Sequence, residues 1–144
     1  MRLTSFTDFG LRALMRLASA PDRLHSTAEI AAEFGISRNH LTKAIAALAD
    51  AGFVETRRGM GGGAVLARPA ETLRIGDVVA TLEGNSALVE CFSANGGACV
   101  ITPICQLKGM LAGAKARFIE DLNRYTLADC ALPRREDRAD DRRR

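Results

Sequence analysis

Hydrophobic residues near the start of the chain recur at every third or fourth position, which is the spacing of one helix face. This pattern predicts a first helix over residues 5–20, which ends at Pro21 because proline cannot continue a helix. Ser26 or Thr27 can cap a second helix, since either hydroxyl oxygen can accept a hydrogen bond from the free N–H groups of a first turn. The second helix is expected to stop at Gly35, because glycine tolerates the positive φ of a helix end.

A third helix and a short hairpin follow. Ser37 is placed to cap the third helix, which ends near Gly52. Strand-like runs at residues 53–58 and 64–69 are joined by the glycine-rich segment 59–63, which permits a tight hairpin turn. The apolar face of the third helix comprises Leu41, Ile45, Leu48 and Ala49. The first half of the chain therefore predicts three short helices and a two-stranded hairpin.

The second and third predicted helices carry the features of a helix-turn-helix. Ala31 is small enough for two helices to cross closely, and Gly35 follows at the turn. The hairpin comes directly afterwards with Arg57 and Arg58, and this order is typical of a winged helix-turn-helix. A wing of this kind can place its arginines along phosphates or in the minor groove. The sequence therefore predicts binding to double-stranded DNA.

The polar residues on the outward side of the third helix are candidate contacts to the major groove. Asparagine can pair with adenine, and arginine or lysine with guanine. The alternative is that these residues form only the solvated face of an amphipathic helix. His25 precedes the second helix and is interpreted as a surface residue. The candidate DNA contacts are Ser37, Arg38, Asn39, His40, Thr42 and Lys43 on the helix, with Arg57 and Arg58 on the wing.

The second half of the chain predicts a short helix, a loop and a long helix. Residues 73–84 suit the short helix, and residues 91–105, "CFSANGGACVITPIC", lack clean periodicity and are expected to form a loop. The long helix begins near Thr102, with Pro103 suited to its first position. A narrow apolar seam along it predicts pairing with the same helix of a second subunit, as a homodimer. The seam consists of Ile104, Leu107, Leu111, Ala114, Phe118, Leu122 and Tyr125.

Composition narrows the class of protein. At 144 residues the chain suits one domain, or a small domain with a helical appendage, and a multidomain enzyme is not expected. No run reaches the roughly 18 apolar residues that span a bilayer, and the N-terminus is too polar for a signal peptide, so we expect a cytoplasmic protein. The formal net charge of +3 has its basic excess at both ends of the chain, which fits contact with phosphates without requiring it.

Cysteines are concentrated in the predicted loop. Cys91, Cys99 and Cys105 have the spacing C-x7-C-x5-C, which does not match the C-x2-C pairs of structural zinc sites. In a reducing compartment such thiols are metal ligands or redox sensors more often than disulfides. Iron-sulfur clusters accept this looser spacing, because the ligands must surround a whole cluster. The alternative is that the cysteines are small buried hydrophobes, and Cys130, which stands apart, is expected to be non-ligating.

Several longer segments resemble the winged-helix iron-sulfur transcription regulators, and among them the nitric-oxide-sensing NsrR-type repressors. The resemblance covers residues 1 to about 130 and implies a homodimer in which each subunit's loop holds a 4Fe-4S cluster, with 2Fe-2S as the alternative. The three cysteines of the loop match the ligands of that group. The similar segments are "MRLTSFTDFGLRALMRLAS", "GISRNHLTKAIAALADAGFVETRRGMGGG", "RIGDVV", "ITPICQLKGML" and "FIEDLNRYTLADC".

The resemblance also implies a fourth ligand and a signal. In some NsrR-type proteins this ligand is an aspartate from the first helix of the other subunit, and Asp8 matches its position. An iron with an oxygen ligand is the natural first point of attack by nitric oxide, because carboxylate binds iron more labilely than thiolate does. The implied function is a repressor that nitrosylation releases from operator DNA. The seven-residue first cysteine gap departs from the shorter gap that is common in NsrR-type proteins. A longer gap is also seen in the iron-responsive RirA branch of the same group.

These inferences divide the chain into parts. Residues 1–84 form the winged helix-turn-helix domain, 85–106 the cluster-binding loop, 103–130 the dimerisation helix and 131–144 a charged tail that is expected to be disordered. The fold class is mainly α with a small β-hairpin wing. The alternatives of function are an iron- or cluster-status regulator of the same fold, a thiol-redox enzyme using Cys99 and Cys105, and a DNA-binding protein with structural zinc.

Overall fold

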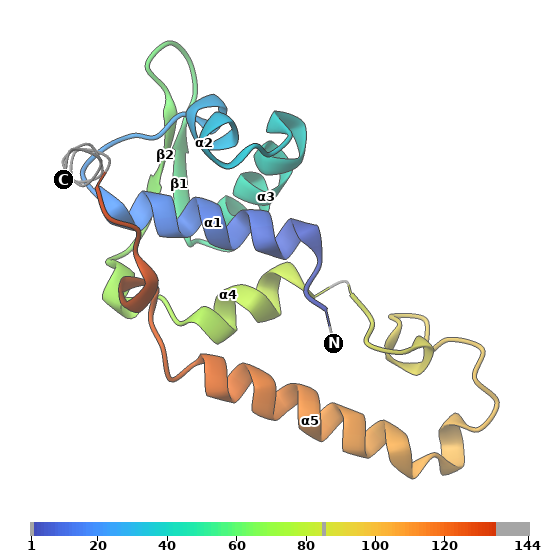
Figure 1. Cartoon of the computed structure of the whole chain (residues 1–144). Coiled ribbons are helices and arrows are strands. Elements are labelled where there is room, and N and C mark those ends of the chain that lie inside the picture. Colours follow the sequence, from blue (N-terminus) through green and yellow to red (C-terminus); the bar gives the residue numbers. More distant parts are fainter. Residues whose placement is uncertain (1, 85, 135–144) are drawn as a thin grey trace.

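The structure is a computed structural model that describes residues 2–84 and 86–134. Its N-terminal half contains a helical layer and a hairpin, as the sequence predicts. Figure 1 shows α1 crossing the middle of the molecule, with α2, α3 and the hairpin on one side of it and α4 and α5 on the other. The elements of this half are α1 (Ser5–Ser19), α2 (Thr27–Phe34), α3 (Arg38–Asp50), β1 (Val54–Arg57) and β2 (Gly63–Leu66). The predicted mainly helical fold with a small hairpin is confirmed.

The helix-turn-helix is formed by local interactions. The Ser26 hydroxyl accepts from the Glu29 backbone N–H at 3.1 Å and caps α2. Gly35 ends α2 with φ 63°, where a side chain would be strained. Ser37 stands at the cap position of α3, but its hydroxyl makes no capping hydrogen bond and is exposed. Its predicted position is therefore right and its predicted bond is absent.

The core lies between α1 and the elements on either side of it. Leu14 and Leu17 of α1 are fully buried, as are Leu41 and Leu48 on the inner face of α3. Burying a leucine side chain contributes about 1.5–3 kcal/mol, so this inner face fixes the orientation of α3. The opposite face of α3 is thereby held outward.

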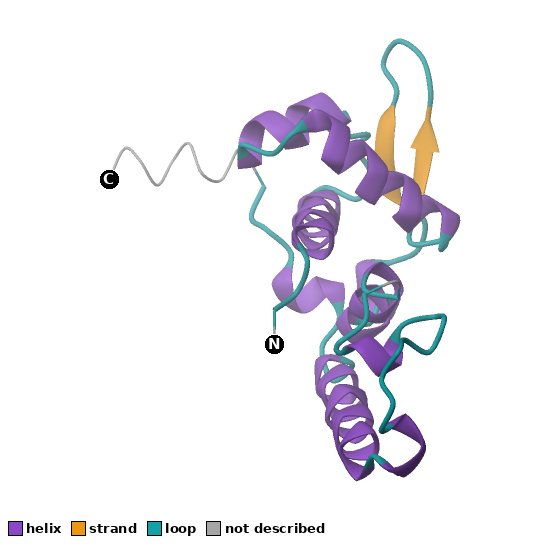
Figure 2. Ribbon diagram, turned by 90° about the vertical axis from the view of Figure 1, so that its right-hand side faces the viewer, coloured by secondary structure: helices purple, strands orange, loops and turns teal. Residues whose placement is uncertain are grey.

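The hairpin is a two-stranded antiparallel sheet in which Val54 pairs with Leu66 and Arg57 with Gly63. Its inner end packs on the core, because Val54 and Ala64 are buried. Its tip extends away from the rest of the molecule (Figure 2), and Met60 at that tip is fully exposed. The hairpin therefore has the shape predicted for a wing.

The C-terminal half contains α4 (Ile75–Leu82), an irregular segment and α5 (Gln106–Leu122). The long helix is shorter than the predicted span of 103–130. A 3-10 turn at Thr102–Ile104 precedes it, and Cys105 is extended with ψ 104°, so the helix begins only at Gln106.

Asn123 ends α5. Its side-chain oxygen accepts from the Asp77 N–H at 2.9 Å, and its amide donates to the Asp77 carboxylate at 2.9 Å. The chain then turns back to the core, where Leu127 is fully buried and its N–H donates to the Leu73 carbonyl at 2.8 Å. These contacts join the region of α4 to the end of α5 and to the segment after it, between residues about fifty positions apart.

The described part of the chain contains no helix that is both long and apolar enough to cross a membrane. Of the predicted charged tail, residues 131–134 continue from the last 3-10 turn without regular structure, and residues 135–144 lie outside the described residues.

Candidate nucleic-acid interface and cysteine loop

The predicted recognition residues lie together on the outward face of α3. Leu41, Ala44 and Ile45 are buried on the inner face, so the polar residues between them point outward. The Thr42 hydroxyl donates to the Arg38 carbonyl of its own helix at 2.8 Å. The structure exposes Ser37, Arg38, Asn39, His40, Thr42 and Lys43.

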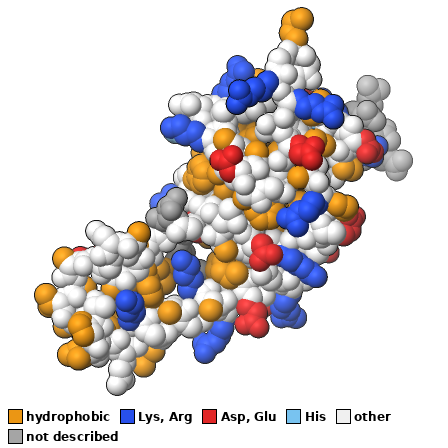
Figure 3. Space-filling view, turned by 180° about the vertical axis from the view of Figure 1, so that it is seen from behind, with side chains coloured by type: hydrophobic (Ala, Val, Ile, Leu, Met, Phe, Trp, Pro, Cys, Tyr) orange, Lys and Arg blue, Asp and Glu red, His pale blue; other side chains and the backbone are white. Residues whose placement is uncertain are grey.

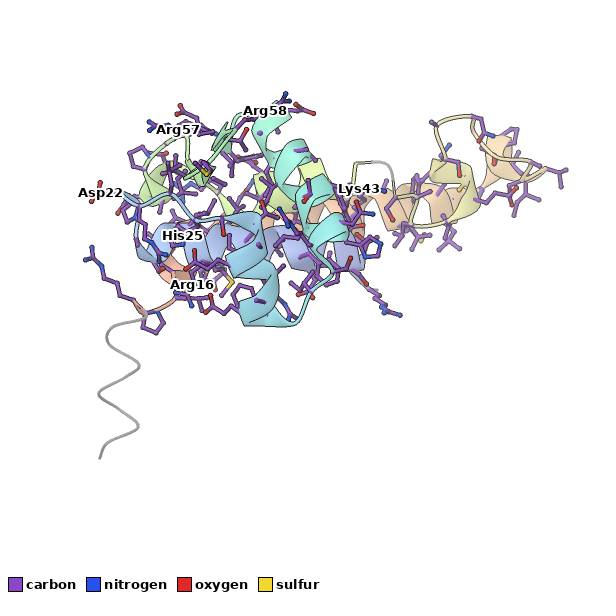
Figure 4. The ribbon with its side chains drawn as sticks, turned by 90° about the horizontal axis from the view of Figure 1, so that it is seen from above. Arg16, Asp22, His25, Lys43, Arg57 and Arg58 are labelled. Atoms are coloured by element: carbon purple, nitrogen blue, oxygen red, sulfur yellow. The ribbon has the colours of Figure 1, made fainter. Side chains whose placement is uncertain are left out.

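The wing adds positive charge beside this face. Arg57 ends β1 and Arg58 follows it, and both are exposed. Figure 4 looks down on this end of the molecule and shows Arg57 and Arg58 at the hairpin and Lys43 on α3. Figure 3 shows Lys and Arg side chains on both flanks of the hairpin. The structure therefore brings the recognition helix and the wing to one end of the molecule.

His25 is buried, and the prediction of a surface residue is wrong. Its side chain is 1% exposed. Its backbone N–H donates to the Ala64 carbonyl at 3.0 Å, and its carbonyl accepts from the Ala64 N–H at 2.8 Å. A side chain at Gly63 would meet the His25 carbonyl oxygen at 2.6 Å. His25 therefore ties the loop between α1 and α2 to the wing strand β2.

The imidazole of His25 is held neutral by its surroundings. Burial lowers its pKa, and this outweighs the hydrogen bond to the Ala20 carbonyl that favours the charged form. Nε2 lies 3.4 Å from the Ala20 carbonyl oxygen, and Nδ1 is buried with no partner among the described residues. No local pattern signals this burial, because the strand that pairs with His25 is about forty residues further along the chain.

The three cysteines of the C-x7-C-x5-C pattern lie at separate places along one irregular segment. We call residues 86–105 the cysteine loop. Cys91 is in a 3-10 turn at Glu90–Phe92, Cys99 follows a bend at Ala98, and Cys105 directly precedes α5. All three thiols are free and half-buried.

Two glycines shape the middle of the cysteine loop. Gly96 and Gly97 have φ of 77° and 64°, which a residue with a side chain rarely adopts. The Glu90 carboxylate accepts from the Ala98 N–H at 2.8 Å and closes this turn. A Gly-Gly turn therefore separates Cys91 from Cys99.

Within residues 2–84 and 86–134, no group of three or more His, Cys, Asp or Glu side chains lies close enough to hold a metal ion. The cysteines nevertheless suit iron by chemistry, because they are free thiols, and thiolates are the ligands of iron-sulfur clusters. Short-range hydrogen bonds hold the turns of the loop, such as those from the Phe92 N–H to the Val89 carbonyl and from the Ala98 N–H to the Glu90 carboxylate.

Asp8 lies on the first turn of α1, on the molecular surface. Its carboxylate accepts from Arg12 Nε at 3.0 Å and lies 2.8 Å from Arg12 NH2. Both side chains are about 45% exposed. Asp8 is thus placed where a second subunit could reach it.

Cys130 lies in a 3-10 turn at Leu127–Cys130 and not near the end of the long helix. It packs against the hydrophobic core, and its thiol donates to the Leu127 carbonyl at 3.5 Å. Burial and the neighbouring Asp129 raise the pKa of this thiol, so its thiolate form is disfavoured. These features fit the expectation that Cys130 is not a ligand.

Two charged residues that the sequence did not single out organise the helices. Arg16 is 1% exposed and forms an ion pair with Glu33, while its NH1 donates to the Ser19 hydroxyl and the Pro133 carbonyl. Glu83 is 9% exposed and accepts hydrogen bonds at the start of α1. No periodicity signals such pairs, because the partners come from different helices.

A protein-family model and several solved structures match this chain. The family model, Rrf2, is described as an iron-dependent transcriptional regulator and matches residues 3–132. The structure of IscR from T. potens has 28% sequence identity and a TM-score of 0.67, and the match covers 90% of this chain and 85% of that one. A transcriptional regulator of Listeria innocua has 30% identity and a TM-score of 0.67 over the same shares. CymR, the global cysteine regulator of B. subtilis, shares the fold at 23% identity and a TM-score of 0.68, over 91% and 96% of the two chains.

Proposed function

The chain belongs to the Rrf2 family of DNA-binding transcriptional regulators, and we propose that it is a repressor whose hold on operator DNA is controlled by an iron-sulfur cluster that senses nitric oxide. The family confirms the predictions of a regulator rather than an enzyme and of a winged-helix DNA-binding fold. The observation that carries the finer proposal is the cysteine loop, with three free, half-buried thiols in the segment that follows α4.

The exposed face of α3 is the proposed reader of the major groove, and the wing is the proposed contact to phosphates or the minor groove. Arg38, Asn39 and Lys43 have the donors that read guanine and adenine. Arg57 and Arg58 carry fixed charge on a rigid hairpin, which suits phosphate contact. The hydrophobic core beneath α3 and the paired backbone hydrogen bonds between His25 and Ala64 of β2 set the spacing between the recognition face of α3 and the wing.

A homodimer would place two recognition helices on one operator. No residue of α5 is buried, and large apolar side chains at its first half and just before it face solvent. Such a surface is usually covered by a partner, and a two-fold dimer would read half-sites about 34 Å apart. The exposed apolar residues are Val100, Ile101, Ile104, Leu107 and Met110.

Cys91, Cys99 and Cys105 would hold the cluster, and Asp8 of α1 would supply an oxygen ligand to the cluster of the other subunit. A bound 4Fe-4S cluster would supply iron that reacts with nitric oxide. While its ligands bind the cluster, the protein would hold the cysteine loop in place between α4 and α5. Release of the ligands would free the loop, and a change in α4 reaches α3 because the two helices are in contact.

The identity of the cluster is tested by native mass spectrometry and visible absorbance on anaerobically purified protein. We expect a coloured dimer with one 4Fe-4S cluster per subunit, and a 2Fe-2S mass would support the alternative nuclearity. The variants Cys91→Ser, Cys99→Ser and Cys105→Ser should each lose the cluster, whereas the matched control Cys130→Ser should keep it. A colourless protein that binds zinc through the same cysteines would contradict the proposal.

An iron- or cluster-status regulator is the second candidate. It is favoured by the description of the family as iron-dependent and by the likeness to IscR. A mild iron chelator separates the two candidates. A cluster that resists the chelator and reacts with near-stoichiometric nitric oxide supports nitric oxide as the signal, and the reverse supports iron.

A further inference from the structure

Glu83 joins three parts of the molecule: the start of α1, the end of α4 and the start of the cysteine loop. Its Oε1 accepts from the Thr4 backbone N–H at 2.7 Å, from the Thr4 hydroxyl at 2.8 Å and from the Thr7 hydroxyl. Its backbone carbonyl accepts from the Ser86 N–H at 2.7 Å. We call Thr4, Thr7, Glu83 and Ser86 the α1–α4 clamp.

The carboxylate of Glu83 is ionised and fully engaged. Its burial raises the pKa, but the hydrogen bonds from Thr7 and Thr4 lower it by more, so the net pKa is below the ordinary value. The negative charge also lies at the N-terminus of α1, where the helix dipole stabilises it. Because Oε1 accepts from three donors and the Ser86 side chain also bonds the carboxylate, Glu83 acts by holding its neighbours and not as a ligand.

The two helices also pack closely beside the clamp. Gly10 of α1 is buried, and a Cβ there would lie 2.6 Å from a Leu82 methyl carbon. Leu82 directly precedes Glu83, so apolar contact and hydrogen bonds act at adjacent positions. Asp8 lies within the clamped turn, and its N–H donates to the Thr4 carbonyl at 3.0 Å.

We propose that Glu83 is a positioning residue for the cluster: through the α1–α4 clamp it holds Asp8, the ligand given to the partner, in a fixed relation to the cysteine loop of its own subunit. This inference rests on the proposed function. In a homodimer each subunit gives one Asp8 and receives another. A change at one cysteine loop would therefore move the ligand of the other cluster, and the clamp links the two sites of the dimer.

The test compares two clamp variants with a matched control in the full-length, anaerobically reconstituted dimer. Glu83→Gln keeps the size of the side chain and removes its charge, and Thr7→Val removes one donor hydroxyl. Glu71→Gln is the control, because Glu71 is an exposed glutamate in the 3-10 turn Ala70–Thr72. Far-UV circular dichroism of the cluster-free proteins establishes that each is folded, and if Glu83→Gln does not fold, Thr7→Val takes its place throughout.

The readouts are the visible circular dichroism of the cluster and the rate at which EDTA bleaches it. We expect bleaching to be about ten-fold faster in Glu83→Gln, with a change in the same direction in Thr7→Val and none in Glu71→Gln, because residues that orient ligands commonly contribute 10- to 100-fold to metal affinity. A purely structural role would lower the thermal midpoint of the cluster-free protein and leave the spectrum and the bleaching rate unchanged, and that result would overturn the inference.

A double-mutant cycle with Asp8→Ala shows whether Glu83 acts through Asp8. If it does, Asp8→Ala alone speeds bleaching and Glu83→Gln adds nothing in that background. Additive effects would overturn the inference while the role of Asp8 stands. A wild-type rate in Asp8→Ala would remove Asp8 from the ligand set, and with it both this inference and that part of the proposed function.

Discussion

Asp8 and Arg12 form a two-point ion pair on the surface of α1, with Nε 3.0 Å from one carboxylate oxygen and NH2 2.8 Å from the other. The pair orients the carboxylate of the candidate ligand and at the same time competes for its lone pairs. An i,i+4 pair this exposed contributes little to folding.

Replacing Arg12 should therefore affect the reaction of the cluster with nitric oxide but have little effect on folding stability. We expect Arg12→Ala to change the free energy of unfolding of the cluster-free protein by less than about 0.5 kcal/mol. In the cluster-loaded dimer the same variant should change the rate of reaction with nitric oxide, because the proposed oxygen ligand loses its partner. Urea unfolding and stopped-flow absorbance measure the two quantities, and an unchanged rate would argue against Asp8 as a ligand.

The buried ion pair between Arg16 and Glu33 is expected to matter for folding. Glu33→Gln leaves the charge of Arg16 in a site where its side chain is 1% exposed, at a cost of about 3–5 kcal/mol. Urea denaturation should show this loss. Arg23→Gln is the control, because Arg23 pairs with Glu29 at the surface and should cost less than about 1 kcal/mol. Equal losses of unfolding free energy in the two variants would show that the buried pair contributes no more than the surface pair.

His25 should make folding stability depend on pH. Its pKa is lowered in the folded protein, so below pH 6.5 the unfolded chain takes up a proton that the folded chain does not. Stability should therefore fall as pH drops from about 6.5 towards the folded pKa of His25. Urea midpoints between pH 8 and 5 measure the effect, and His25→Gln should flatten the slope in this window.

Glu83 produces a second acid-sensitive window at lower pH. Its folded pKa lies below the ordinary value of 4.5, so the stability that it contributes is present above that pH and is lost as pH falls through the folded pKa. Glu83→Gln should remove this lower step and leave the slope above pH 5 unchanged. If Glu83→Gln also removed the loss of stability that begins below about pH 6.5, this loss could not be assigned to His25.

The wing arginines should act on DNA through charge. Arg58→Ala is expected to weaken binding to all DNA sequences alike and to reduce the slope of log affinity against log salt by about 1, the value for one phosphate contact. Lys108→Ala is a control of equal charge on α5, remote from the wing. Fluorescence anisotropy at several salt concentrations measures the slopes. An unchanged slope in Arg58→Ala would remove Arg58 from the phosphate contacts.

The parts of the fold that follow from the sequence are those set by neighbouring residues. The Ser26 cap and the positive φ of Gly35 and Gly52 depend on interactions within a few positions, so the helix ends of the first half are predictable. The end of α5 is not, because it depends on Asn123 meeting Asp77 from another helix. The burial of His25 likewise depends on β2.

In the candidate site, too, the features set by neighbouring residues are predictable from the sequence and the long-range contacts are not. The amphipathic pattern of α3 placed its outward residues correctly, since one buried face determines the other. The cysteine pattern identifies the loop and its thiols but not their convergence, because the proposed site includes a residue of a second chain. Clamp contacts such as that between Glu83 and Thr4 join positions 79 residues apart and have no local signal.

In the proposed function, the state of the cluster controls the affinity of the protein for DNA. The most direct test is the affinity of one preparation for an operator fragment obtained by binding selection, measured in the cluster-loaded, cluster-free and nitric-oxide-treated forms at one salt concentration. We predict tight binding by the cluster-loaded dimer and at least about ten-fold weaker binding by the other two forms, a difference of about 1.4 kcal/mol. Equal affinity in all three forms would contradict the account.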